Sequence, residues 1–311
     1  MTPHTTGQTV GLSNDLRALS REARLDKARF NPASLVLLSP AGILLLGLFL
    51  APVVYAIYLG FTNLQLIGLH AVNYRFTGWA NVNTLLHDTT FYQSIWLTVL
   101  FVVGSGAVGA TLLGLVMAIA MQDCLRLIRQ ITGALAIVAW TLPPTTIAIV
   151  WKASSTESGL IPTLLGNSNY DLLYDQAMLV VSLANAWSLA GLSMIMFSAA
   201  LRNVPQEVLA AAKLEGASRA QTLVRVTLPM LRSTIVTSSL LMTLLTFGNF
   251  TLIYLMTAGG PGNQTNILPV YSYLQGFKFF NLGYSALLGN VIVLISAVLG
   301  GLFVYLGKQR R

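Results

Sequence analysis

Residues 203–229 read NVPQEVLAAAKLEGASRAQTLVRVTLP, a polar stretch that separates two long apolar runs of the chain. Asn203 followed three residues later by Gln206 is the pattern of a helix N-terminus, in which the side chains bind free backbone N–H groups. Gly216 is the residue type that most readily adopts the left-handed conformation found where helices end. The pattern therefore predicts a short helix that stops at Gly216.

A second helix is expected directly after this turn. Ser218 and Gln221 repeat the N-terminal pattern, and Pro229 marks the point where the hydrogen-bond ladder breaks and the next apolar run begins. Residues 210–212 are alanines, whose small side chains let another protein come close to the helix backbone. We therefore predict a helix-turn-helix unit that docks a partner protein.

The composition is that of a membrane protein. The chain has 311 residues, of which 55% are hydrophobic and 9% are charged, and its mean hydropathy is +0.70. Each apolar run is near or above the roughly 20 residues that a helix needs to cross a bilayer. The predicted transmembrane runs are 34–61, 93–121, 131–151, 177–201, 233–257 and 282–306. We expect an all-α integral membrane protein with six transmembrane helices, the third bent by Pro143 and Pro144.

The chain divides into a leader at residues 1–33 and a membrane domain at residues 34–311. The first apolar run is too long for a signal-peptide core, so we expect it to remain as the first helix. Apolar residues in the leader recur at helical spacing between Arg and Lys residues. Two alternatives stay open for it, a helix on the membrane surface and a solvated segment held by lipid head groups.

The distribution of positive charge predicts the orientation of the chain. The net charge is +8, and all but three of the 18 Lys and Arg residues fall on one side when the N-terminus is placed in the cytoplasm. The three exceptions are Arg75, Lys152 and Lys278. Both termini and residues 203–229 are therefore expected in the cytoplasm of a multi-pass inner-membrane protein. Nucleic acid is not an expected partner, because no basic stripe is interleaved with aromatic residues.

No apolar run contains an Asp, Glu, Lys, Arg or His in its interior. A proton-driven transporter or a voltage sensor commonly needs such a group at membrane depth. The pair Gly307 and Lys308 lacks the spacing of a phosphate-binding loop, and the three histidines are scattered, so we expect no catalytic residues, metal or bound cofactor. The lone Cys124 is assigned no role. Energy for transport must then come from another subunit.

Uncharged polar groups at membrane depth suit a neutral, hydroxyl-rich solute. Amides donate and accept hydrogen bonds at once, and aromatic faces stack on sugar rings. Asn185 in the fourth run and Asn249 in the fifth are the strongest candidates, with Trp187, Phe247 and Tyr254 as candidate wall residues. For either asparagine, a structural hydrogen bond between helices is as good an interpretation as contact with the solute. For the aromatic residues, packing is the more frequent role.

Residues 203–229 also resemble the EAA motif of binding-protein-dependent ABC importer permeases. That motif reads Glu-Ala-Ala, three residues, Gly, nine residues, Ile, one residue and Leu-Pro. This chain keeps the two alanines, the glycine and the Leu-Pro pair, has Val226 for the Ile, and has Ala210 in place of the motif's carboxylate. The resemblance implies a loop that couples to an ATPase through Glu207, Ala210, Ala211, Ala212, Glu215, Gly216, Leu228 and Pro229.

Three further segments are similar to carbohydrate permeases of the maltose-transporter type, on the side of the pair with the longer N-terminus. They are residues 38–63, which open with LSP and close with FTN, the WK at 151–152 followed by GLI at 159–161, and AGGPGNQT at 258–265. The resemblance implies that sugar contacts lie on the helices before and after the coupling loop. The implied positions are Asn185, Ser188, Leu192, Leu245, Thr246 and Asn249. At Ser188, Leu192, Leu245 and Thr246 the residue types depart from the maltose pattern.

The family resemblance implies the fold of a type I ABC importer permease and a set of partners. These are a second permease, two ABC ATPase subunits that bind ATP and Mg²⁺, an extracytoplasmic solute-binding protein, a sugar or polyol substrate, and the lipid bilayer. Two other functions are compatible with the sequence, a facilitator that acts alone and a non-transporting membrane scaffold whose cytoplasmic loop binds a soluble partner. Copurification of an ATPase and a second permease distinguishes the three.

Overall fold

The computed structural model describes residues 32–167 and 169–308, and the chain divides into two compact units, Met1–Tyr55 and Ala56–Arg311. The described part of the first unit begins with α2 (Pro32–Leu45), a π-helical turn η1 (Leu46–Leu50) and the start of α3 (Ala51–Gly60). Together these form an apolar helix at Val36–Gly60, long enough to cross a membrane. The expected amphipathic pattern in the leader lies outside the described residues.

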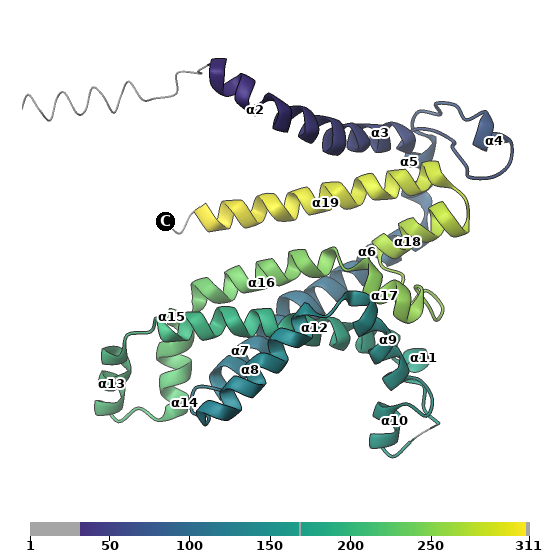
Figure 1. The fold of residues 1–311 in the computed structure, drawn as a ribbon. Coiled ribbons are helices and arrows are strands. Elements are labelled where there is room, and N and C mark those ends of the chain that lie inside the picture. Colours follow the sequence, from purple (N-terminus) through teal and green to yellow (C-terminus); the bar gives the residue numbers. More distant parts are fainter. Residues whose placement is uncertain (1–31, 168, 309–311) are drawn as a thin grey trace, which may run out of the picture. The chain divides into compact units, whose positions relative to one another are not determined.

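The regular elements among the described residues of the second unit are helices, joined by turns and loops, and one isolated bridge pairs Thr62 with Phe76 (Figure 1). Its helices are α4 (Leu69–Val72), α5 (Ala80–His87), α6 (Thr89–Phe101), η2 (Val102–Ala110), α7 (Thr111–Ala120), α8 (Arg126–Thr141), α9 (Pro144–Ser155), α10 (Leu160–Leu164), α11 (Leu172–Asp175), α12 (Ala177–Arg202), α13 (Gln206–Leu214), α14 (Arg219–Thr222), η3 (Leu223–Thr227), α15 (Leu228–Met230), α16 (Arg232–Phe247), α17 (Phe250–Thr257), α18 (Leu268–Tyr273), η4 (Leu274–Lys278) and α19 (Leu282–Lys308).

Four of the described helices are long and apolar enough to span a membrane, and two bent helix pairs bring the number up to six. The four are Val36–Gly60, Thr89–Ala120, Ala177–Arg202 and Leu282–Gly301. The pair α8 and α9 is bent by 105°. The bend falls where expected, because Leu142 precedes a proline and is extended, with φ −62° and ψ 137°. The all-helical membrane fold is thereby confirmed.

The fifth apolar run differs from its prediction as one continuous helix over 233–257. α16 ends at Phe247, and α17 starts at Phe250 after a break at Gly248 and Asn249. Asn249 has φ −88° and ψ 59°, and its side chain makes no capping bond. Its side-chain amide instead donates a hydrogen bond to Asn185 on α12.

α12 lies at the centre of the second unit and packs against α7, η2, α8 and α16. Small residues at four-residue spacing in η2 and α7, namely Gly106, Ala110 and Gly114, permit the close approach. A Cβ atom on Gly106 would lie 2.4 Å from Thr246 Oγ1, and one on Gly114 would lie 2.4 Å from Ser193 Cβ. Ala110, between the two glycines, is fully buried. The small-residue stripe is thus a packing seam.

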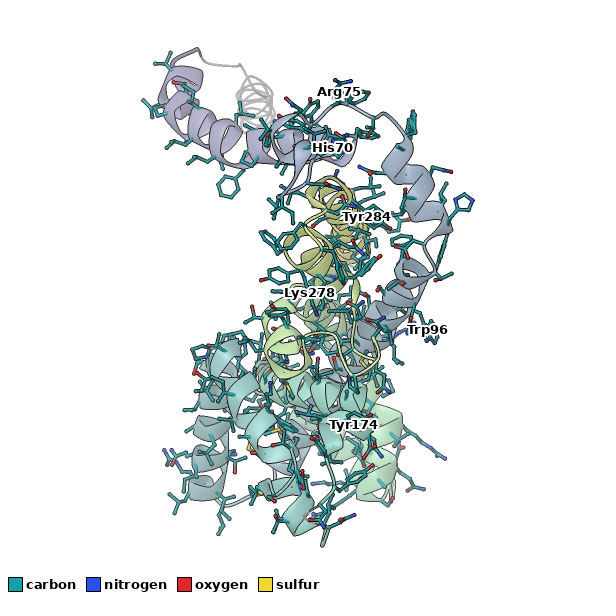
Figure 2. The ribbon with its side chains drawn as sticks, turned by 90° about the vertical axis from the view of Figure 1, so that its right-hand side faces the viewer. His70, Arg75, Trp96, Tyr174, Lys278 and Tyr284 are labelled. Carbon is teal, nitrogen blue, oxygen red and sulfur yellow. The ribbon has the colours of Figure 1, made fainter. Side chains whose placement is uncertain are left out.

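A carboxylate ties α6 to the helices at the end of the chain. Asp88 caps α6 through a 2.9 Å bond from the Thr90 N–H group to Oδ1. Its Oδ2 accepts hydrogen bonds from the hydroxyls of Tyr271 on α18 and, at 2.6 Å, of Tyr284 on α19. Figure 2 labels Tyr284 in the first turn of α19. Asp88 thus joins α6 to α18 and α19, which lie far from it in the sequence.

These contacts predict a pH-dependent stability. Burial opposes ionisation of Asp88, but hydrogen bonds from Tyr271, Tyr284 and the backbone of Phe91 and Thr90 hold its pKa below the ordinary value. A depressed pKa stabilises the fold above the unfolded value of about 3.9, and this stabilisation is lost as the pH falls through the folded pKa. In thermal unfolding of the detergent-solubilised protein, the contribution of Asp88 to stability should therefore be constant above about pH 5 and decline below about pH 4.

The substitution Asp88→Asn should lower the free energy of unfolding at pH 7 by about 1.5–3 kcal/mol and flatten the profile below pH 4. Asp123→Asn is the control, because that carboxylate is 81% exposed and should change little. An unchanged acid limb in the Asp88→Asn protein would show that other groups govern acid unfolding.

Candidate functional site

The helix-turn-helix predicted at residues 203–229 is present, but its first helix starts later than expected. Asn203 is not the N-cap of α13. It is the C-cap of α12, and its backbone N–H group bonds to the carbonyls of Ala200 and Leu201. Pro205, with φ −59° and ψ 127°, precedes α13 instead and makes no side-chain capping bond. The reason is that α12 continues to Arg202, so Asn203 is used to end that helix.

The turn and the second helix start as predicted. Gly216 has φ +80°, and the next N–H group, that of Ala217, bonds to the Ala212 carbonyl at 3.0 Å. Ser218 and Gln221 form a capping box, with bonds of 3.3 Å from the Gln221 N–H group and 2.8 Å from the Ser218 N–H group. These local signals determine the turn without help from distant residues.

The break before α16 lies slightly beyond its predicted position. Pro229 is inside α15, near its N-terminus, where a missing N–H group costs little. The segment Arg219–Met230 meets α16 at a bend of 68°, across Leu231, which is 1% exposed. Burial of the Leu231 side chain thus accompanies the bend.

Most residues predicted to couple to a partner are exposed. Those exposed are Glu207, Ala210, Ala211, Glu215, Gly216 and Pro229, and those partly buried are Ala212 and Leu228. Leu214, in the last turn of α13, is 90% exposed, and the sequence reading overlooked it. The sequence did carry a signal for an exposed contact residue here, because Leu214 is an apolar residue in an otherwise polar helix end.

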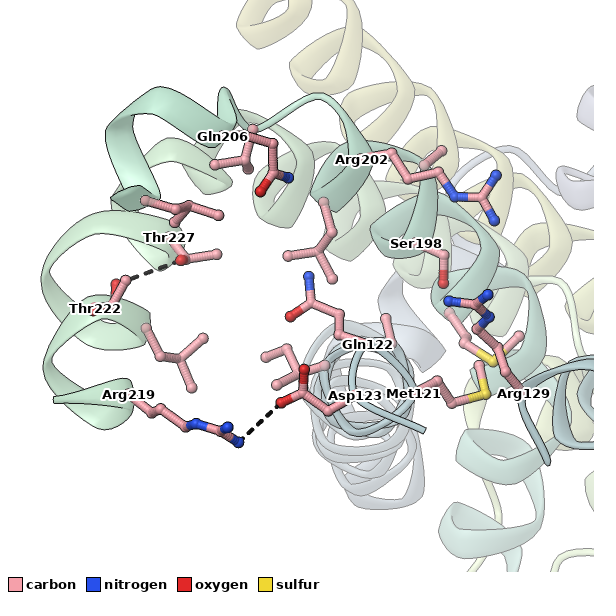
Figure 3. Close-up of a pocket in the computed structure, with 18 of the residues that line it drawn as sticks. Met121, Gln122, Asp123, Arg129, Ser198, Arg202, Gln206, Arg219, Thr222 and Thr227 are labelled. Atoms are coloured by element: carbon pink, nitrogen blue, oxygen red, sulfur yellow. Dashed lines mark hydrogen bonds and ion pairs between the residues drawn. The ribbon is translucent and has the colours of Figure 1, made fainter. Parts of the chain in front are cut away.

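A cavity of about 1160 Å³ separates this helix-turn-helix from the ends of α7 and α12 (Figure 3). Gln122, Arg129, Arg202 and Gln206 are among its lining residues. An ion pair of 3.2 Å between Asp123 and Arg219 spans its edge. Both side chains are largely exposed, so the pair contributes at most about 1 kcal/mol. The ion pair therefore adds little to the attachment of the helix-turn-helix, whereas Leu209 of α13 packs against the apolar cluster that contains Met194 and Phe197.

The second candidate region is a buried polar network within the bundle. Asn185 on α12 is fully buried, and its Nδ2 donates to Ser105 Oγ on η2 and to Thr246 Oγ1 on α16, both at 2.9 Å. Asn249 Nδ2 donates to Asn185 Oδ1 at 2.9 Å. Ser188 Oγ donates to the Asn185 carbonyl at 2.8 Å. Asn185 thus makes the interhelical hydrogen bonds that were one of its two predicted roles.

The structure brings together the four polar residues of the predicted pathway and leaves the two leucines apart. Leu192 packs against an apolar cluster that contains Ala110 and Met242, and Leu245 is 41% exposed. The network includes Ser105, which the sequence analysis did not single out. Its only signal was a hydroxyl in the middle of a glycine-rich apolar run.

The candidate wall residues occupy different environments. Trp187 is 40% exposed and lies edge-on to Trp151, with ring centroids 6.2 Å apart. Phe247 is buried in the main apolar cluster. Tyr254 is partly buried and belongs to a group of stacked rings considered below. Phe247 therefore serves packing.

Helices of membrane length around an uncharged polar network, with an exposed helix-turn-helix between two of them, define a polytopic membrane protein with a docking surface for a partner. The family model for the binding-protein-dependent transport system inner membrane component matches residues 110–311, and the chain belongs to this family. It is thus a permease subunit, and relatives of known name extend the likeness beyond the matched region.

The sulfoquinovosyl glycerol transport system permease protein SmoG of Agrobacterium fabrum is 28% identical over 276 residues, covering 85% of this chain and 86% of SmoG. The trehalose/maltose transport system permease protein MalF of Thermococcus litoralis is 30% identical over 246 residues, covering 76% of this chain and 81% of MalF. A chain in the crystal structure of a bacterial alginate ABC transporter superposes with a TM-score of 0.71 at 17% identity, covering 88% of this chain and 93% of that one. The fold is therefore that of ABC importer permeases.

Proposed function

We propose that this chain is one of two permease subunits of an ATP-driven importer for a sugar or polyol and forms half of its translocation pathway. The exposed helix-turn-helix at residues 203–229 carries the proposal, because it presents a protein-docking surface on a chain with no phosphate-binding loop in its sequence. Two ATPase subunits bind ATP and Mg²⁺, and a solute-binding protein delivers the substrate.

The docking of an ATPase is supported by the geometry of α13. Its alanines leave the backbone accessible, and Leu214 offers an apolar side chain that a partner would bury. The cavity behind α13 gives this helix room to shift relative to α7 and α12. ATP-driven closure of the ATPase pair would then move α13 and α14 and change access to the region of Asn249.

The proposed orientation rests on the distribution of charge. Arg and Lys residues are concentrated at the helix-turn-helix end and in both terminal segments, which favours a cytoplasmic location for these parts. The bundle end that carries Asp88 and α18 then faces outward. The proposed location is the bacterial inner membrane, with the lipid bilayer around the apolar helices.

The proposed substrate class follows from chemistry and from the relatives. The permeases SmoG and MalF are named for a sulfoquinovosyl glycerol and for trehalose and maltose. In this chain the buried polar network consists of amides and hydroxyls without charge. Such groups suit neutral hydroxyl-rich solutes, and Asn249 is the member of the network that is partly exposed.

Affinity purification from mild detergent tests the proposal. We expect a second permease and an ATPase to copurify with the tagged chain, and the reconstituted complex to accumulate sugar only when ATP and the loaded binding protein are present. Uptake by this chain alone in liposomes would instead establish a facilitator. Copurification of a soluble partner without any uptake would establish a scaffold.

A further inference from the structure

Four aromatic side chains form a continuous cluster at the bundle end opposite the helix-turn-helix. They are Phe250 and Tyr254 on α17, Tyr273 on α18 and Phe277 on η4, and we call them the aromatic track. α16 has 16 residues and so separates this end from the helix-turn-helix by about 24 Å. The track therefore lies at the bundle end proposed to receive the solute.

The rings of the track pack against one another, and Phe250 also contacts Tyr273 directly, with ring centroids 5.3 Å apart. Ring centroids are 5.2 Å apart for Phe250 and Tyr254, 4.7 Å for Tyr254 and Tyr273, and 5.0 Å for Tyr273 and Phe277. The first and last of these pairs are stacked, with interplanar angles of 20° and 29°. The rings thus support one another as a preformed platform.

The track runs from the buried core to the surface. Phe250, Tyr254 and Tyr273 are partly buried and pack against the main apolar cluster, whereas Phe277 is 55% exposed. The neighbouring Lys278 is the charged residue nearest to it in sequence. Phe277 therefore presents an exposed ring at the outer end of the track, and the phenol groups of Tyr254 and Tyr273 add hydrogen-bonding atoms to the apolar rings behind it.

The inner end of the track meets the polar network. Asn249 directly precedes Phe250 and donates through Nδ2 to Asn185. In the part of the chain that the structure describes, the Asn249 Oδ1 atom accepts no hydrogen bond, and the residue is partly exposed. A free amide acceptor therefore lies beside the first ring of the track.

We propose that the aromatic track is a sugar-binding subsite on which the apolar face of a pyranose ring stacks before it reaches Asn249. Stacked and tilted rings bind the C–H face of a sugar, and the adjacent amide and phenol groups bind its hydroxyls. The proposal rests on the proposed function and adds an entry site that is separate from the Asn185 network. It commits to a neutral carbohydrate as the occupant.

The test uses the complete transporter in proteoliposomes with its binding protein. Radiolabelled maltose, trehalose and a panel of neutral mono- and disaccharides are the probes, and uptake and ATP hydrolysis are measured together. For Tyr273→Leu and Phe277→Leu we expect about a tenfold fall in sugar transported per ATP hydrolysed, because one stacking contact is lost. Tyr273→Phe keeps the ring and should keep most of the uptake.

The control is Trp96→Leu. Trp96 is also aromatic and 64% exposed, and it points away from the neighbouring helices (Figure 2). It should leave both rates unchanged. An unchanged ratio of uptake to ATP hydrolysis in the track variants would overturn the subsite. So would loss of the second permease from them, because the rings would then form a subunit interface. Failure of the unaltered complex to take up any sugar would refute the proposed function itself.

Discussion

Gly216→Val is expected to abolish solute uptake while the chain still reaches the membrane. Gly216 has φ +80°, a conformation that a β-branched residue adopts only at a cost of about 1–2 kcal/mol or more. A Cβ atom at this position would meet no other atom within 4 Å, so the effect comes from the backbone and not from a clash. The turn between α13 and α14 would change its geometry, and the ATPase would lose its docking surface.

The measurement is uptake in whole cells together with the amount of the chain in the membrane fraction. We expect uptake to fall at least tenfold and the membrane content to stay within about twofold, because the turn is exposed and strain there is local. Copurification of the ATPase should fall in parallel with uptake.

Two controls separate conformation from bulk. Gly216→Asn should retain most of the uptake, because asparagine tolerates the left-handed region. Gly289→Val adds the same bulk at a helical position with open space around it and should transport normally. Normal uptake by Gly216→Val would refute the coupling role of the turn.

Asn185→Leu is expected to lower stability strongly. Asn185 is fully buried and bonds through its side chain to Ser105, Thr246 and Asn249. Leucine would remove the donor to the buried hydroxyls of Ser105 and Thr246, and each unsatisfied buried group costs about 1–3 kcal/mol. Leucine is also larger, and overpacking costs about 1–3 kcal/mol more. We expect a large fall in the melting temperature and in the amount of chain in the membrane.

Thr246→Val and Asn249→Leu are the matched comparisons. Thr246→Val keeps the shape and removes one hydroxyl, so it should cost only about 1 kcal/mol. Asn249→Leu changes a partly exposed residue and should reduce transport more than stability. Equal melting temperatures for Asn185→Leu and the unaltered protein would show that the network does not hold the helices together.

Signals carried within a few neighbouring residues were read correctly from the sequence. The capping box at Ser218 and Gln221, the left-handed Gly216 and the bend at Pro143 each depend on local backbone geometry. The apolar runs were equally clear, because a bilayer requires long apolar helices whatever their neighbours. Neighbouring residues and the surrounding lipid were therefore enough to predict these features.

The identity of distant partners was not predicted, although an interhelical hydrogen bond was one of the two roles expected for each asparagine. Asn203 matches a helix N-cap in its local pattern, yet α12 continues to Arg202 and uses Asn203 at its own end. The break between α16 and α17 leaves Asn249 free to bond to Asn185, a residue 64 positions away. No local pattern contains this information.

The sequence by itself determined the apolar runs, the bend in the third span and the turn at Gly216. Only the tertiary structure decided that Asn185 joins neighbouring helices through hydrogen bonds with Ser105, Thr246 and Asn249. The same holds for Asp88, which accepts hydrogen bonds from two tyrosine hydroxyls. Helix formation and turns follow from neighbouring residues and the surrounding lipid. The choice of partner for a buried polar group follows from which helices pack together, and long-range packing makes that choice.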